Sequence, residues 1–575
     1  MKILFNDDRF KNYKISDLKK DFIAGITVGI VAIPLAMAFA IASGVKPEYG
    51  LYTTIIAGFI VSLIGGSRFQ IAGPTGAFIP ILLAIVIQYG YEKLLIAGFL
   101  AGILLLLMGV FKLGNLITYI PRSVTIGFTA GIAVIIFTGQ LENFFGLEGV
   151  AKKEYFHENM AELIKQIQTI NLYSILTALL GLAIIIIVPR FFRRVPILLV
   201  ALLIPTIISA VFYPTKVETI GSKFGGISQS LPTFHFPELT FTTFIDLLGP
   251  AFVIAILGGI ESLLSAVVAD GMTGTRHHSN KELVGQGVAN MVTPLFGGIP
   301  ATGAIARTAT NINSGAVSPL SGIIHSVFVL LTILVFAPFA SYIPLASMAS
   351  ILMIVAWNMS ERREVIQILK LKNEDSLVLA LTFLLTVFIN LTVAVEVGLI
   401  LAMLLFIKRM SHLLEVEKVL PKTHFGKVSP DPVEAGHRCP QIMIYTIHGP
   451  LFFGAANKFE RVLTQSIHKK PKVIILRMRH VSMIDATGEN QLRNFIENVK
   501  KQGGVVILSG LQKEPLELLM KSGLYQSLTS DHIFKSTGEA ITYALSIIDQ
   551  HYCQTCKFNN FKECASFKKE KIFAK

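Results

Sequence analysis

The sequence predicts a polytopic α-helical membrane domain followed by a smaller soluble α/β domain. Hydrophobic residues make up 52% of the 575 residues, mean hydropathy is +0.62, and only 15% of residues are charged, against about 25% in an average soluble protein. The charge is unevenly distributed, because 38 of the 88 Asp, Glu, Lys and Arg residues lie in residues 412–575. Apolar runs of about 20 residues, long enough to cross a bilayer as helices, occur before that segment.

We predict fourteen membrane crossings. Ten are continuous apolar runs, near residues 22–43, 50–66, 94–112, 123–140, 172–189, 196–213, 247–269, 320–338, 376–391 and 393–410. Four are shorter or interrupted by Gly and Pro, near residues 72–89, 283–297, 303–317 and 344–358. The domains expected from this pattern are a cytoplasmic N-terminal segment (1–20), a transmembrane domain (21–411), a linker (412–439), an α/β domain (440–550) and a basic tail (551–575).

The distribution of Lys and Arg predicts the orientation. An even number of crossings places both termini on one side of a cell (inner) membrane. If that side is the cytoplasm, most basic residues between the crossings lie in cytoplasmic loops, as the positive-inside rule requires. The net charge of +14 therefore indicates membrane orientation, and no nucleic-acid partner is expected.

A weak internal repeat divides the crossings into two halves. Thr75-Gly76-Ala77 recurs as Thr302-Gly303-Ala304, and the same offset of 227 relates the first crossing to the eighth. Two halves of seven crossings each would have opposite orientations. This is the 7+7 inverted repeat of many secondary transporters.

The repeated segments predict an anion-binding site. In residues 71–77 and 298–304, Gly and Pro precede a short apolar run, which indicates extended backbone followed by a half-helix that begins at membrane mid-depth. The unpaired N–H groups and positive dipole end of such a helix attract anions. Irregular backbone is tolerated at this depth only where it lines a cavity or is buried in protein. The alternative is a pair of kinked helices that serve only packing.

Two charged residues lie within these apolar segments. Glu261 is in the eighth crossing, and Arg307 is one helical turn into the second half-helix. Intramembrane charges are costly and usually face a cavity or each other. We therefore expect a Glu261–Arg307 pair that releases Arg307 for substrate when Glu261 is protonated, which would couple protons to anion transport. A purely structural ion pair is the alternative. The candidate substrate-binding residues are Gly73, Pro74, Thr75, Gly76, Ala77, Glu261, Ser265, Thr302, Gly303, Ala304, Ala306 and Arg307.

The first two crossings carry a family resemblance. The segments 21–29, 33–38, 44–45 and 49–52 (DFIAGITVG, IPLAMA, GV and YGLY) resemble the opening signature of the SulP anion transporters. The Gly73-Pro74-Thr75 segment and Glu261 also match. The resemblance implies a core domain of crossings one to four and eight to eleven that moves against a gate domain, with substrate bound between the third and tenth half-helices. In sodium-coupled bicarbonate relatives the arginine is absent, so Arg307 places this chain with the sodium-independent branch.

Residues 440–550 alternate strand and helix patterns, which predicts an α/β domain. The run Met483-Ile484-Asp485-Ala486-Thr487-Gly488 resembles the loop of STAS (sulfate transporter and anti-sigma-factor antagonist) domains. In the antagonists a Ser or Thr before that glycine is phosphorylated, which makes Thr487 a candidate regulatory residue. Capping of the following helix by Asp485 and Thr487 is the alternative.

The C-terminal tail suggests a metal site. His551, Cys553, Cys556 and Cys564 have the identities of zinc ligands, and the first two cysteines have the Cys-x2-Cys spacing. A redox-active thiol set or no role are the alternatives, and Cys439 could replace His551 as a ligand. No cofactor is expected to be required for transport.

The expected function is proton-coupled symport of a small anion such as sulfate, bicarbonate or a dicarboxylate by alternating access. The alternatives are an anion exchanger or uncoupled anion channel, and a membrane-anchored signalling scaffold. No nucleophilic triad, P-loop or intramembrane metal motif indicates an enzyme. The expected partners are the anion, H+, the lipid bilayer, a second copy of the chain and a cytoplasmic protein bound by the STAS domain.

Overall fold

The computed structural model describes residues 8–10, 13–115, 120–153, 155–192, 196–227, 229, 232–236, 240–421, 428–430, 439–467, 470–528 and 530–556. The chain divides into two compact units, residues 1–402 and 403–575. The division falls inside helix α19, earlier in the chain than the change in charge density at residue 412.

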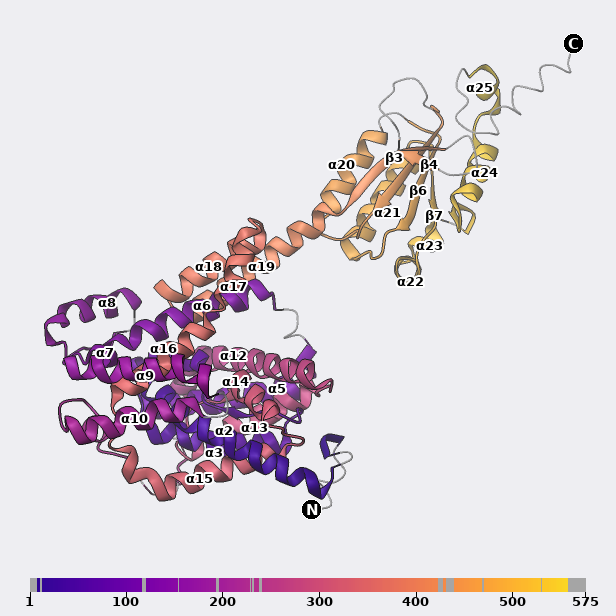
Figure 1. The fold of residues 1–575 in the computed structure, drawn as a ribbon. Coiled ribbons are helices and arrows are strands. Elements are labelled where there is room, and N and C mark those ends of the chain that lie inside the picture. Colours follow the sequence, from indigo (N-terminus) through magenta and orange to yellow (C-terminus); the bar gives the residue numbers. More distant parts are fainter. Residues whose placement is uncertain are drawn as a thin grey trace, which may run out of the picture. The chain divides into compact units, whose positions relative to one another are not determined.

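Each of the fourteen predicted crossings contains a helix (Figure 1). In the first half these are α2 (Ile15–Ala42), α3 (Pro47–Ile64), α4 (Ile79–Tyr89), α5 (Tyr91–Val110), α6 (Arg122–Gly139), α9 (Leu172–Phe191) and α10 (Ile197–Phe212). In the second half they are α12 (Phe241–Thr273), α13 (Ser279–Leu295), α14 (Ile305–Asn313), α15 (Leu320–Ala340), α16 (Leu345–Met359), α18 (Glu374–Phe388) and α19 (Leu391–His412). Within the described residues, eight helices are long and apolar enough to cross a membrane by length and composition alone.

Shorter helices connect these elements. They are η1 (Asp8–Phe10), η2 (Gly76–Phe78), α7 (Leu141–Phe145), α8 (Phe156–Lys165), η4 (Ile167–Thr169), α11 (Ile220–Phe224) and α17 (Arg362–Lys370). Residues 141–171, which lie between two predicted crossings, therefore contain helical structure. Helix α2 likewise begins at Ile15, inside the segment predicted to precede the membrane domain, and Lys19 and Lys20 in its first turns are exposed.

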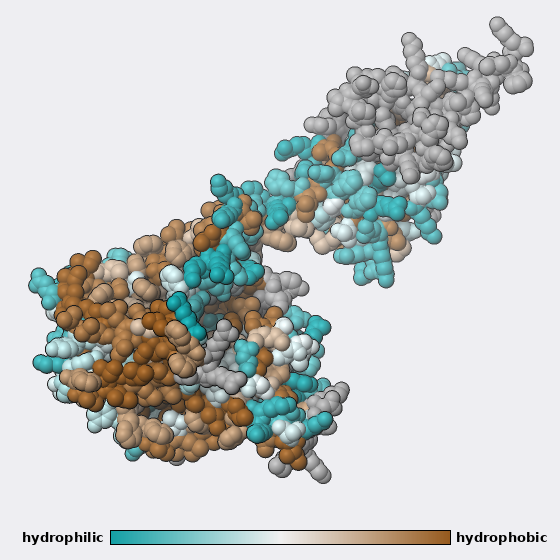
Figure 2. Space-filling model, in the orientation of Figure 1, coloured by the Kyte–Doolittle hydropathy of each residue, from teal (hydrophilic) through white to brown (hydrophobic). Residues whose placement is uncertain are grey.

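The helices of the first unit pack in two groups. One group joins α2, α3, α4, α5, α12, α13, α14 and α15, whose main partners are one another. The other joins α6, α7, α9, α10, α16, α17 and α18. These groups agree with the predicted core and gate. Apolar side chains cover much of the visible surface of this unit (Figure 2), as the outer face of a membrane domain requires.

The second unit is a six-stranded sheet in the order β4-β3-β5-β6-β7-β8. Its strands are β3 (Glu415–Pro421), β4 (Val428–Pro430), β5 (Ile442–His448), β6 (Val473–His480), β7 (Val505–Ser509) and β8 (Ile533–Phe534). Strands β5 to β8 are parallel, and β3 and β4 are antiparallel to their neighbours. The helices of this unit are α20 (Ala456–Ile467), α21 (Ala486–Lys501), α22 (Lys513–Lys521), α23 (Leu524–Ser527), α24 (Thr537–Ile547) and α25 (Gln550–Thr555).

The predicted linker at 412–439 needs correction. It contains β3 and β4, which extend the sheet beyond β5. The alternation of charged and apolar residues in Glu415-Val416-Glu417 is the signal for a strand of this kind.

Candidate functional site

Two short extended segments meet inside the core group of helices. Strand β1 (Ala72–Gly73) pairs antiparallel with β2 (Thr302–Gly303), and Ala72 lies opposite Gly303. The N–H of Ala304 also donates to the carbonyl of Ile71 at 2.9 Å. An antiparallel pair is what a two-fold relation between repeated segments produces. The structure thus brings the two repeated segments, residues 71–77 and 298–304, together.

Helix α12 anchors the extended β2 segment. The N–H of Gly303 donates to Ser262 Oγ at 2.9 Å, and Thr302 Oγ1 donates to the carbonyl of Gly258 at 3.0 Å. These bonds satisfy polar groups that would otherwise be buried without partners, which would be costly. Glu261 lies on the same helix, so α12 positions both the carboxylate and the second half-helix.

A hydroxyl pair links α12 to the first extended segment. Ser265 Oγ donates to Thr308 Oγ1 at 3.1 Å, and Thr308 Oγ1 also accepts from the N–H of Ile71. Ser265 therefore contacts the extended segment through Thr308, and its role in substrate binding stays a prediction.

Both half-helices begin without a side-chain cap. Thr75 precedes η2 and Ala304 precedes α14, and neither side chain bonds the first turn. At the start of α14, Ile305 and Ala306 are exposed. The first N–H groups of a helix have no partner within the helix, and they form an anion-binding position where no cap covers them.

Arg307 places a buried positive charge beside these helix starts. Its side chain is 2% exposed, and Nη2 donates to the carbonyl of Pro74. Within the described part of the chain, Nη1 has no hydrogen-bond partner. The guanidinium lies against Gly73, where a Cβ atom would come within 2.5 Å of Nη1. Arg307 thus bridges the two repeats and retains unused donors.

The prediction of a direct Glu261–Arg307 ion pair is wrong. Glu261 Oε2 accepts a hydrogen bond from Thr75 Oγ1 at 2.9 Å, and the ion pairs of the described residues include none between Glu261 and Arg307. The carboxylate and the guanidinium instead contact neighbouring residues of the same segment, Thr75 and Pro74. Protonation of Glu261 would therefore act first on the Thr75 hydroxyl.

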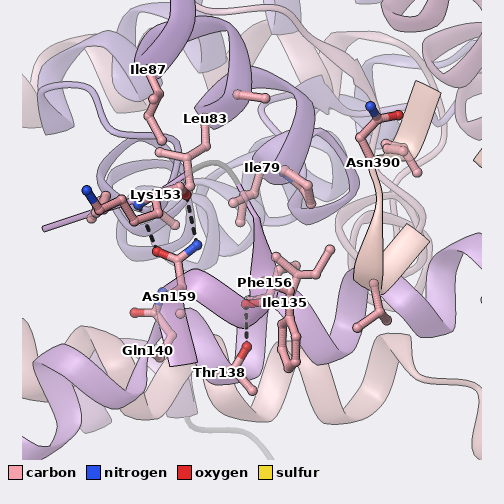
Figure 3. Close-up of a pocket in the computed structure, with 18 of the residues that line it drawn as sticks. Ile79, Leu83, Ile87, Ile135, Thr138, Gln140, Lys153, Phe156, Asn159 and Asn390 are labelled. Carbon is pink, nitrogen blue, oxygen red and sulfur yellow. Dashed lines mark hydrogen bonds between the residues drawn. The ribbon is translucent and has the colours of Figure 1, made fainter. Parts of the chain in front are cut away.

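A cavity of about 150 Å³ extends from the first half-helix toward the gate group (Figure 3). Ile79 at the start of α4 lines it, with Ile135 of α6, Phe156 of α8 and Asn390 before α19. Asn159 holds the loop beside it, accepting from the N–H of Lys153 at 2.9 Å and donating to its carbonyl at 2.8 Å. The cavity lies between core and gate elements.

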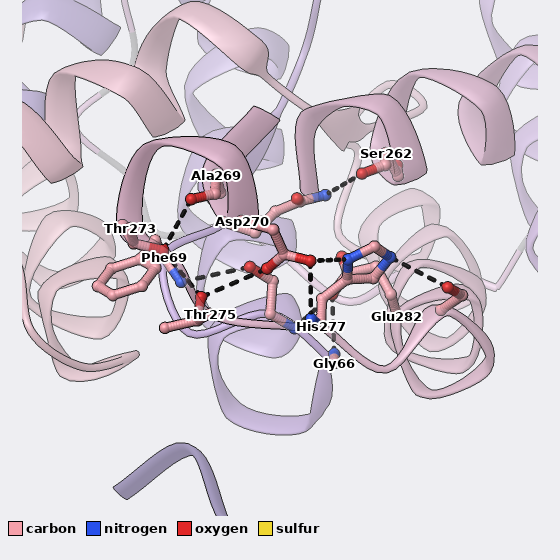
Figure 4. Close-up of polar contacts among 12 residues, drawn as sticks. Gly66, Phe69, Ser262, Ala269, Asp270, Thr273, Thr275, His277 and Glu282 are labelled. Carbon is pink, nitrogen blue, oxygen red and sulfur yellow. Dashed lines mark hydrogen bonds and ion pairs between the residues drawn. The ribbon is translucent and has the colours of Figure 1, made fainter. Parts of the chain in front are cut away.

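A polar cluster fixes the far end of α12 (Figure 4). Asp270 Oδ2 contacts His277 Nδ1 at 2.7 Å and accepts from the backbone N–H of His277 at 2.9 Å. Buried Glu282 accepts from the N–H groups of Gly66 at 2.8 Å and Ser67 at 3.1 Å. These contacts hold the turn after α12 and the start of α13 against the chain that leads to β1.

Sequence reasoning missed the supporting residues Ser262 and Thr308. Ser262 follows Gly258 by four residues, and Ser265 follows Ser262 by three, so all three share one face of α12. This spacing of small and polar residues in an apolar helix is the sequence signal that could have identified Ser262.

The C-terminal motif is only partly described, because Cys564 lies outside the described residues. Cys553 is buried against the helix-α24 side of the sheet, and its sulfur accepts from Gln441 Nε2 at 3.4 Å. Over the described residues, no three His, Cys, Asp or Glu side chains form a group that could hold a metal. Zinc binding by His551, Cys553, Cys556 and Cys564 stays a prediction.

The STAS-like loop caps helix α21. Asp485 Oδ1 accepts from the N–H of Gly488 at 2.8 Å, and Oδ2 accepts from Phe453 at 2.9 Å. Thr487 is exposed in the first turn and is not the capping residue. Its regulatory role stays a prediction.

Comparison with known proteins identifies the family. The model for the sulfate permease family matches residues 18–382, and the STAS domain model matches residues 437–540. The chain belongs to the sulfate permease family. It is a multi-pass membrane protein with a STAS domain.

Two curated relatives cover nearly the whole chain. A putative sulfate transporter (YvdB) of Bacillus subtilis is 55% identical over 92% of this chain and 98% of its own length. The bicarbonate transporter BicA of Picosynechococcus is 30% identical over 93% of this chain and 96% of its own. Both names are those of transporters.

Solved structures show the same fold. The structure of SLC26A9 matches with a TM-score of 0.85 at 20% identity, covering 96% of this chain and 93% of that one. The transmembrane domain of a cyanobacterial BicA matches with a TM-score of 0.59 at 32% identity, covering 68% of this chain and 98% of that one.

Proposed function

We propose that this protein is a secondary active transporter of a small anion, namely sulfate, bicarbonate or a dicarboxylate, and that it couples uptake to protons. The observation that carries the proposal is the position of Arg307. Its buried guanidinium has an unpartnered Nη1 beside two half-helices that both begin without a side-chain cap. Positive charge and free N–H donors converge there, which suits an anion and not a neutral solute.

Thr75 and Glu261 supply the coupling. While Glu261 is ionised, Thr75 Oγ1 donates to it, and the carboxylate repels an incoming anion. A protonated Glu261 carries its own O–H donor, which can donate to Thr75 Oγ1 and leave the Thr75 proton for the anion. Proton and anion binding would then favour each other.

The movement we propose is an elevator-type displacement of the core group against the gate group. Gly73, Pro74, Glu261 and Arg307 all belong to the core group, so the site would move as one body. The cavity between α4 and α6 lies where an opening between the two groups would form. We also propose a homodimer with cytoplasmic N- and C-termini and a STAS domain that binds a cytoplasmic protein.

Reconstitution into proteoliposomes tests this function. Uptake of labelled sulfate, bicarbonate, succinate, nitrate and chloride would be measured with and without an inward proton gradient. We expect accumulation of at least one of the first three above equilibrium, only when the gradient is present. Equilibration without accumulation would instead indicate a channel, and uptake that requires a counter-anion would indicate an exchanger.

A further inference from the structure

A row of polar side chains crosses the STAS sheet where its parallel strands end. Arg477 of β6 lies opposite Thr446 of β5 and Ser509 of β7. Opposed residues share a face of the sheet, and this face carries α24. Ligands of open parallel α/β sheets bind at the carboxyl ends of the strands.

Arg477 organises the hydroxyl groups of this row. Its Nη1 donates to Thr446 Oγ1 at 2.9 Å, and its Nε donates to Thr537 Oγ1 of α24 at 3.1 Å. Ser509 Oγ lies 3.5 Å from Thr537 Oγ1. Because Thr446 and Thr537 accept from Arg477, their own protons are available to donate, and Nη2 of Arg477 has no partner in the described part of the domain.

A second arginine and two imidazoles lie beside this row. Arg479 lies two residues along β6 on the same face, and His448 and His480 stack with ring centroids 4.8 Å apart. Partial burial and neighbouring Arg479 lower the pKa of Arg477. Desolvation, then His448 and the two arginines, lower the pKa of His480. Burial is the larger cause of both pKa shifts, and the neighbouring basic groups add to it.

No carboxylate of the described residues forms an ion pair with any of these four basic groups. Glu539, the acid in the first turn of α24, instead accepts from the backbone N–H of Ser536. An arginine that served only to join β5 to α24 would not need a second arginine and two histidines beside it. The cluster lacks its counter-ion.

We propose that Arg477, Arg479, His448 and His480, with the hydroxyls of Thr446 and Thr537, form an oxyanion-binding site in the STAS domain. A sulfate ion or a phosphate group fits this chemistry, because several oxygens can accept from the guanidinium and the hydroxyls at once. The group can belong to a free inorganic ion or to a phosphate ester.

Binding of labelled inorganic phosphate to the full chain in nanodiscs tests the site. Arg307→Ala is used as the background to weaken binding at the proposed transport site. The STAS site is measured as the difference between this background and further variants of the STAS residues, which does not depend on the transport proposal. We expect saturable binding of one phosphate per chain, and a loss of affinity of about tenfold or more in the Arg477→Gln/Arg479→Gln variant. Lys500→Gln, an exposed change at the end of α21, should bind as the background does.

Two further arms complete the experiment. If sulfate displaces the labelled phosphate more readily than a mononucleotide does, the ligand is a free ion. If the mononucleotide displaces it more readily, the ligand is a phosphate ester. Arg479→Gln alone changes an exposed side chain, so it should weaken binding several-fold without loss of folding, as thermal melting would verify. Absence of saturable binding, or equal binding by the double variant, would overturn the proposal.

Discussion

At the scale of single residues, we propose that Arg307 gives the site its preference for anions. It is the largest of the fully buried side chains, and it uses Nη2 on the Pro74 carbonyl while Nη1 has no partner among the described residues. A buried cation with unused donors is costly unless a ligand completes its contacts. The bound anion is that ligand in our account.

Arg307→Ala should therefore reduce anion affinity by about 100-fold, as expected when a charged hydrogen-bonding partner is lost. Arg307→Lys should retain part of the affinity, because lysine keeps the charge but not the planar set of donors. Binding of labelled sulfate to purified protein measures both, with gel filtration as the check on folding. Wild-type affinity in the alanine variant would refute the role of Arg307.

We expect Thr75 to contribute to anion binding only through its hydroxyl group. Thr75→Val keeps the shape but removes the donor, so anion affinity should fall by about three- to tenfold at low pH, where Glu261 is protonated. Thr75→Ser should remain near wild type. A valine variant with unchanged affinity at every pH would show that Thr75 does not contact the anion.

The sequence singles out the candidate site residues, but it does not predict which of them contact one another. Gly, Pro and rare intramembrane charges mark the site in the sequence. Whether Glu261 meets Arg307 or Thr75 depends on how α12 packs against the half-helices, which no local pattern encodes. Ser262 and Thr308 were missed for the same reason.

At the scale of elements, the site depends on close approach between β1 and α14. Gly73 permits this approach, because a Cβ atom there would come within 2.5 Å of Arg307 Nη1. The added methyl group would contact the end of the flexible Arg307 side chain and not the backbone. An alanine there would therefore displace the guanidinium and also strain the backbone, because Gly73 has a φ of +157°, which L side chains rarely adopt.

Gly73→Ala should consequently lower anion affinity by about tenfold or more, since the displaced guanidinium loses charged hydrogen bonds to the anion, and backbone strain should also lower its melting temperature. Gly271→Ala is the matched control, because its Cβ would meet no atom within 4 Å. Uptake and thermal melting of both variants should be compared. Equal loss in both would show that the effect is not specific to Gly73.

The tail element offers a separate prediction. If His551, Cys553, Cys556 and Cys564 bind zinc, purified protein should contain about one zinc per chain, and binding should weaken as pH falls because thiolates must be deprotonated. Elemental analysis of wild type and Cys556→Ser measures this. A zinc content far below one per chain, unchanged by the mutation, would exclude the site.

Continuous apolar runs predicted the helix positions of the membrane unit. Strands β3 and β4 were not predicted, because their short, partly charged segments resemble a linker. Helix α8 was also missed, since it lies in a polar loop where no 20-residue apolar run marks it.

At the scale of the whole molecule, the two groups of helices separate site from gate. The core group holds both half-helices, α12 and its anchoring cluster of Asp270, His277 and Glu282. The grouping of crossings that the family resemblance implied agrees with this packing. A rigid core that carries Glu261 and Arg307 together is what coupled transport by an elevator movement requires.

The most direct test of coupling compares wild type with Glu261→Gln in proteoliposomes. Glutamine mimics the protonated carboxyl and keeps a donor for Thr75 Oγ1. The variant should bind the anion and exchange it across the membrane, yet fail to accumulate it when an inward proton gradient is imposed, whereas wild type should do both. Normal gradient-driven accumulation by folded Glu261→Gln protein would contradict proton coupling through Glu261.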